Sequence, residues 1–158
     1  MWFSKVPGYL FDKKRTPYFT EAKDLTLAQS QYELVAYGVF VGSLFGIVGL
    51  AATLTFLENN NIIYLIWSLY SAVVIYSIFS VIRNYELIPS YIISLGPSIL
   101  VGFCFYGAFL DNSSILTLTI FICLFLLFLK YGWRVTRIVV WQKYNGNVEI
   151  NNKKAWGQ

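Results

Sequence analysis

The apolar residues of the chain fall into long uncharged runs that are separated by short polar segments. A helix rises about 1.5 Å per residue, so about 20 apolar residues cross the ~30 Å hydrocarbon core of a bilayer. We therefore predict four membrane-spanning helices, over residues 34–57, 62–82, 87–110 and 115–141. The expected fold class is an all-α integral membrane protein, an antiparallel bundle of four transmembrane helices.

The helix ends can be placed from local signals. Thr26 and Gln29 have the spacing of a capping box, so the first helix is expected to start near Thr26. The last apolar run stops at Lys130, but a lysine at the membrane edge can extend its ammonium to the headgroups, so we predict a helix to about Trp141. The chain is thus divided into three parts. Residues 1–25 form an aromatic, basic arm expected against the headgroup region or a neighbouring subunit, and residues 26–141 form the transmembrane domain. Residues 142–158 form a cytoplasmic tail, expected as a turn followed by a short extended or disordered end.

Charge then sets the expected orientation. Only 13% of the residues are charged, against about 25% in soluble domains. All 12 Lys and Arg residues lie in the arm, in the turn at residues 83–86 or from Lys130 onward, and the turns at 58–61 and 111–114 contain none. By the positive-inside rule both termini are expected in the cytoplasm. No organellar targeting segment is evident, so the expected location is the inner (plasma) membrane of a bacterial cell; an organelle-encoded protein would have the same pattern.

The first span carries regularly spaced glycines, which we call the glycine seam: Gly38, Gly42, Gly46 and Gly49. Small residues spaced in this way leave a groove in which another helix approaches closely, and this is a common way for membrane helices to associate. We predict a packing seam, either within the chain or between chains. Ser68, Ser71 and Ala72 of the second span are geometrically suited to meet it.

The third span contains Pro97 between small polar residues. A proline inside a helix removes one backbone hydrogen bond, here the one to the carbonyl of Ile93, so a kink is expected there. Neighbouring serine hydroxyls are expected to satisfy that carbonyl.

Little in the sequence indicates catalysis or metal binding. The chain has no histidine. Its two cysteines, Cys104 and Cys123, lie in apolar runs, so each is expected to be a small buried hydrophobic residue. No span has an acid or base in its middle, which argues against an ion-coupled carrier. We therefore expect no metal, no cofactor and no nucleic-acid partner.

A basic stripe marks the end of the fourth span. Lys130, Arg134 and Arg137 recur at helical spacing, with Trp133 and Trp141 beside them. Cations and tryptophans at a membrane boundary are suited to contact anionic lipid headgroups or an acidic partner.

A second candidate site opens the third span, at Arg83, Asn84, Glu86, Pro89 and Tyr91. It resembles the motif of the membrane-associated eicosanoid and glutathione enzymes, small four-helix trimers whose inner face carries Arg, Asn, Glu and then Pro before an aromatic residue. Here the Asn84 to Glu86 spacing is one residue short, and the site opens the third helix rather than the second. The resemblance, which covers about nine residues, implies a glutathione-dependent or lipid-modifying activity. The alternative is that Arg83 and Glu86 anchor a turn at the interface.

These observations favour an accessory or structural subunit of a larger membrane complex, with other membrane subunits and anionic lipid as partners and no catalysis of its own. The enzyme just described is the first alternative. The second is a homo-oligomeric channel or carrier that uses the glycine and serine faces as a polar path.

Overall fold

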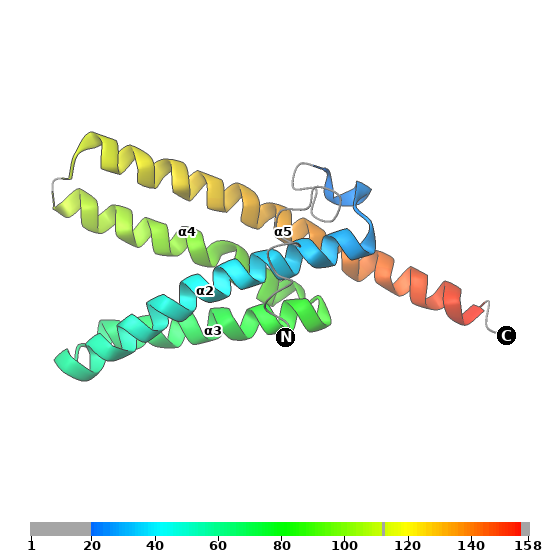
Figure 1. Cartoon of the computed structure of the whole chain (residues 1–158), viewed down its shortest axis with the longest axis horizontal. Coiled ribbons are helices and arrows are strands. Elements are labelled where there is room, and N and C mark those ends of the chain that lie inside the picture. The colour runs from blue at the N-terminus through cyan, green and yellow to red at the C-terminus, as the bar shows by residue number, and fades with distance from the viewer. Residues whose placement is uncertain (1–19, 112, 156–158) are drawn as a thin grey trace, which may run out of the picture.

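The computed structural model describes residues 20–111 and 113–155, the stretch 145–155 by its backbone alone. A short 3-10 helix, η2 (Ala22–Asp24), precedes four α-helices: α2 (Leu27–Asn59), α3 (Ile62–Asn84), α4 (Leu87–Leu110) and α5 (Ile115–Ala155) (Figure 1). In this described part, four helices are long and apolar enough to cross a membrane. The described part of the chain is therefore all-helical, with four helices of the length and composition that a multi-pass membrane protein has.

The predicted start of the first helix is confirmed. Thr26 is the N-cap of α2, and its hydroxyl accepts a hydrogen bond from the Gln29 backbone N–H at 3.2 Å. The Gln29 side-chain oxygen accepts from the Thr26 N–H at 3.0 Å, which completes the capping box. Both donors would otherwise lack partners in the first turn of the helix.

The turns between helices depend on residues that tolerate unusual backbone angles. Asn60 has φ 50° and its N–H bonds to the Phe56 carbonyl at 2.8 Å, which ends α2. Asn61 then caps α3, because its side chain accepts from the Ile63 N–H at 3.0 Å. Asparagine adopts this left-handed conformation more readily than most residues, so two asparagines suffice to connect α2 and α3.

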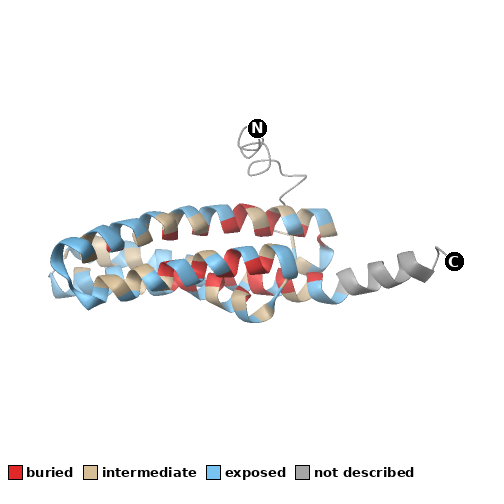
Figure 2. Ribbon diagram, turned by 90° about the horizontal axis from the view of Figure 1, so that it is seen from below, coloured by how far each residue is buried: buried red, intermediate tan, exposed pale blue. Residues whose placement is uncertain are grey.

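The helices form two hairpins, α2–α3 and α4–α5. In Figure 1 the two hairpins lie together near the N-terminal end of α2 and diverge toward their connecting turns, one between α2 and α3 and the other between α4 and α5. We call these two ends of the molecule the Glu33 end and the Asn60 end. Figure 2 shows the buried residues gathered away from the Asn60 end. The core joins all four helices there, through Val41, Phe45, Val74, Ile78, Val81, Ile93, Val135, Ile138 and Val139.

α5 departs from the prediction at its C-terminal end. The helix continues past Trp141 to Ala155, so the predicted turn and extended end are wrong for residues 145–155. Extending an existing helix needs no new nucleation, and this stretch contains no proline.

Two further predictions have different outcomes. Cys104 and Cys123 are exposed on the surface of the chain, so the expectation of buried cysteines is wrong. The arm was predicted over residues 1–25, and all of it up to residue 19 lies outside the described residues.

Candidate functional site

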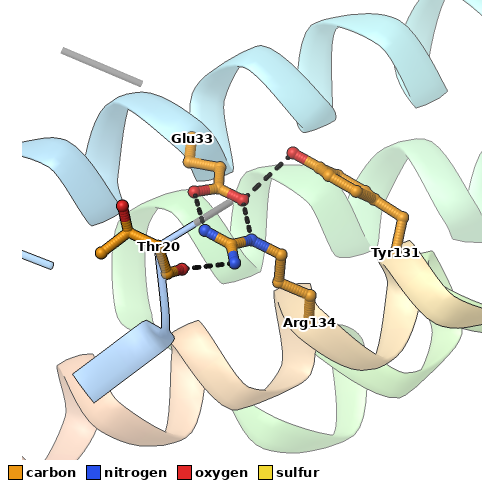
Figure 3. Close-up of polar contacts among 4 residues, drawn as sticks. All are labelled: Thr20, Glu33, Tyr131 and Arg134. Carbon is orange, nitrogen blue, oxygen red and sulfur yellow. Dashed lines mark hydrogen bonds and ion pairs between the residues drawn. The ribbon is translucent and has the colours of Figure 1, made fainter. Parts of the chain in front are cut away.

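The most polar part of the core surrounds Glu33 on α2. Its side chain is fully buried at the membrane boundary predicted from the sequence, one residue before the uncharged run begins. The Glu33 carboxylate accepts from Arg134 Nε at 2.6 Å and from Arg134 Nη2 at 3.0 Å (Figure 3). Tyr131 donates its hydroxyl to the same carboxylate at 3.1 Å. A bidentate pair with a third donor satisfies a buried carboxylate far better than one contact does.

Arg134 also binds the segment that leads into α2. Its Nη1 atom donates to the backbone carbonyl of Thr20, which Figure 3 shows beside the guanidinium. The Arg134 side chain is 18% exposed, and most of its donors are directed into the protein. One side chain of α5 therefore holds both α2 and the residues before η2.

A second polar contact joins the same two helices. Gln142 of α5 is buried, and its Nε2 atom donates to the Leu27 carbonyl at 3.1 Å and to the Ser30 hydroxyl. We call this group the Glu33 cluster; its members are Ser30, Glu33, Tyr131, Arg134 and Gln142. All five lie at the Glu33 end, and each is bonded within the chain.

The carbonyl that Pro97 leaves without a helical donor has a partner on another helix. Tyr37 of α2 donates its hydroxyl to the Ile93 carbonyl of α4 at 3.2 Å, so the expected serine partner is wrong. Ser94 instead bonds Thr136 of α5 at 2.9 Å. The buried hydroxyl of Ser98 has no hydrogen-bond partner in the described part of the chain.

Replacing Tyr37 by phenylalanine should test this contact. The change leaves the Ile93 carbonyl without a donor in the core, and we expect the free energy of unfolding to fall by about 1 kcal/mol. Unfolding in mixed detergent micelles, followed by circular dichroism, measures it. The same change at Tyr76, which is exposed on α3, is the control and should have no effect. Equal effects of the two substitutions would contradict the role given to Tyr37.

α4 and α5 lie in very close contact at a glycine that was not singled out from the sequence. A Cβ atom built on Gly132 would collide with the backbone of Ser94, at 3.0 Å from its Cα and in still closer contact with its carbonyl oxygen. Backbone atoms cannot move aside as a flexible side chain can. Position 132 therefore requires glycine for α4 and α5 to meet.

The glycine seam divides into two groups. A Cβ at Gly38 would lie 2.8 Å from Ile78 Cγ2, and one at Gly49 would lie 2.9 Å from Ser71 Cβ, so both glycines face α3. At Gly42 the nearest atom, Ile78 Cδ1, would be 3.5 Å away, which is ordinary contact. Gly46 has nothing within 4 Å among the described residues. Three of the four glycines thus contact the α2–α3 interface, and Gly46 faces open space.

The basic stripe is not one continuous surface. Arg134 turns inward to Glu33, whereas Lys130, Trp133 and Arg137 are exposed and Trp141 is half-buried. The Arg137 guanidinium lies 5.9 Å from the centre of the Trp133 ring, which is cation–π distance.

Arg137 also lies near η2. Lys23, with its ammonium 2.9 Å from a Glu21 carboxylate oxygen, lowers the pKa of Glu21 by hydrogen bonding and charge. Arg137 lowers the same pKa through its charge alone. The start of the described chain and the exposed side of α5 therefore lie close together at the Glu33 end.

The enzyme-like residues are placed at the turn between α3 and α4. Glu86 is the N-cap of α4, and its carboxylate accepts from the Ser80 hydroxyl at 2.7 Å and from the Asn84 amide at 3.3 Å. Arg83 is exposed and, within the described chain, forms no ion pair with Glu86. Tyr91 is 48% exposed on α4. The structure thus links Asn84 and Glu86 and leaves Arg83 and Tyr91 outside this contact.

No protein-family model, curated protein or solved structure matches the chain. Among the side chains that the structure describes, in residues 20–111 and 113–144, no group of three histidine, cysteine or acidic residues could hold a metal ion.

Proposed function

We propose that this protein is an accessory or structural subunit of a larger membrane complex, with no catalysis of its own. The observation that carries the proposal is the bare surface of α5. Only 6% of its most apolar 18-residue stretch is buried in the chain, against 28–33% in the other three spans. A helix with so little internal contact has a whole face available to the helices of other subunits.

Topology supports this role. In the proposed arrangement the four helices form an antiparallel bundle with both termini in the cytoplasm, in the inner (plasma) membrane. Two observations support this arrangement. Every Lys and Arg lies outside the turns at 58–61 and 111–114, which favours cytoplasmic termini, and the short α2–α3 connection favours antiparallel neighbours. On that orientation the Glu33 end lies at the cytoplasmic surface.

Lipid is the second partner in the proposal. Lys130 and Arg137 are exposed on α5 with Trp133 between them, and Trp141 lies one turn further along. In the proposed topology these side chains reach the headgroup layer, where anionic phosphate attracts the cations and the indoles prefer to reside. Arg134 does not belong to this surface, because Glu33 already binds it.

Gly46 supplies the sharpest test of the proposal. Because a Cβ at Gly46 would have nothing within 4 Å among the described residues, leucine there should leave the fold intact and block a helix that packs on the glycine seam. The chain is extracted in a mild detergent, and native mass spectrometry records its partners and bound lipids. The expected result is that the wild type travels with unrelated subunits in fixed stoichiometry and that Gly46→Leu loses them while still inserting.

Gly107→Leu is the matched control, since Gly107 on α4 also has nothing within 4 Å in the described chain. It should keep the partners. A wild-type chain that runs alone as a dimer, trimer or tetramer would overturn the proposal. Assays for glutathione-dependent activity at Arg83 and Glu86, and for ion flux in liposomes, would then be the next experiments.

A further inference from the structure

In each of the four long helices the buried residues lie almost entirely in one half of the helix. On α3 no described residue before Ser71 is buried, and on α4 none after Val101 is. On α5 burial begins only at Gly132, and on α2 it ends at Phe45 apart from Ala52. The half toward the Glu33 end therefore holds nearly all of the packing, as Figure 2 also shows.

The hydrogen bonds and the ion pair between the two hairpins are also concentrated at the Glu33 end. Glu33 bonds Arg134, Ser30 bonds Gln142, and Tyr37 bonds the Ile93 carbonyl, all at the Glu33 end. Toward the Asn60 end the two hairpins meet through aromatic rings, such as Trp67 and Phe103 with centroids 4.9 Å apart. Apolar ring contacts tolerate sliding, whereas a bidentate ion pair does not.

Each hairpin is held together along its own length. In α2–α3, Thr53 and Ser68 share a hydrogen bond of 2.7 Å close to the Asn60 end. In α4–α5, Gly132 lies directly on the Ser94 backbone, and Gly102 faces Phe125 at ordinary contact distance further out. Each hairpin is therefore expected to move as one body.

We propose that the Glu33 cluster is a fixed hinge about which the two hairpins separate and close at the Asn60 end. In a membrane, lipid tails replace apolar helix contacts at little cost, because the tails are as apolar as leucine. Opening the Glu33 end would instead separate the buried Glu33 carboxylate from the Arg134 guanidinium. Separating the hairpins therefore costs little free energy at the Asn60 end and much more at the Glu33 end. This inference does not depend on the proposed function.

The full-length chain in lipid nanodiscs provides the test, by pulsed electron paramagnetic resonance between pairs of spin labels. Cys104→Ala and Cys123→Ala first remove the exposed native thiols. Labels at Leu57→Cys on α2 and Leu116→Cys on α5 then report the separation of the hairpins at the Asn60 end. Both positions are well exposed, 68% and 72%, so the labels do not disturb the core.

Two reference pairs control for the motion of the labels themselves. Gln31→Cys with Lys143→Cys joins the same two helices at the Glu33 end, and Leu54→Cys with Ile66→Cys joins α2 and α3 near Asn60. All four positions are exposed. We expect the Leu57–Leu116 distance distribution to be at least about twofold wider than either reference. A distribution as narrow as the references would overturn the inference, and so would a Gln31–Lys143 pair as wide as Leu57–Leu116.

Variants of the cluster test whether it is the hinge. Glu33→Gln should widen the Gln31–Lys143 distribution, and Tyr131→Phe, which keeps both charges, should widen it less. Arg137→Gln, an exposed change on α5, should leave it unchanged. A Gln31–Lys143 distance that stays narrow in both cluster variants would show that other contacts hold this end, and would overturn the role given to Glu33.

Discussion

Replacing Glu33 by alanine is expected to lower the free energy of unfolding by about 3 kcal/mol, the largest effect we predict for any single side chain. The substitution leaves the Arg134 guanidinium in the core without its carboxylate, and it also removes the acceptor of the Tyr131 hydroxyl. We place the loss at the low end of values for buried ion pairs because the Arg134 side chain is 18% exposed and can reach toward water. Unfolding in mixed micelles, followed by circular dichroism, measures the change.

Two further variants show whether an unpaired charge causes the loss of stability in Glu33→Ala. Arg137→Ala removes an exposed cation from the same helix and should change the free energy of unfolding by less than about 0.5 kcal/mol. Glu33→Met combined with Arg134→Met removes both charges and should recover at least half of the loss, because no buried charge is left unpaired. If the single and double variants are equally unstable, the loss comes from packing and not from an orphaned charge.

Replacing Gly132 by alanine is expected to lower the free energy of unfolding by about 2 kcal/mol. The added methyl group meets the Ser94 backbone, so α4 and α5 must move apart. That movement also stretches the hydrogen bond between Ser94 and Thr136. These costs outweigh the gain of about 1 kcal/mol that alanine normally brings to a helix interior.

Gly107→Ala is the matched control for this prediction. It makes the same chemical change at a helical glycine with nothing within 4 Å in the described chain, so only the helix-propensity gain remains. The two variants should therefore change stability in opposite directions, measured by the same unfolding assay. Stabilisation by both would mean that α4 and α5 do not approach each other closely at Gly132.

Local sequence signals predicted the helices well. The four uncharged runs fall within α2, α3, α4 and the first part of α5, and the Thr26 capping box was predicted at its observed position. These features depend on residues close together in the chain. The end of α5 was missed because its polar residues resemble a loop, although nothing there stops an established helix.

Contacts between distant residues were not predictable in the same way. Glu33 and Arg134 are separated by 101 residues, and each alone looks like an ordinary charge at a membrane boundary. Gly132 did carry a signal, because a glycine inside a helical pattern often marks close packing, but its partner cannot be read from the sequence. Tyr37 gave no signal, since any of several hydroxyl groups was equally suited to the carbonyl freed by Pro97.

The continuity of α5 has a mechanical consequence. Arg134 divides the helix almost equally, with about 28 Å of rise back to Ile115 and about 31 Å onward to Ala155, at about 1.5 Å per residue. A continuous rod held at its midpoint is a lever with arms of nearly equal length. Any tilt of α5 about Arg134 therefore displaces its two ends by similar distances in opposite directions, so a movement at Ile115 becomes a movement of about the same size at Ala155.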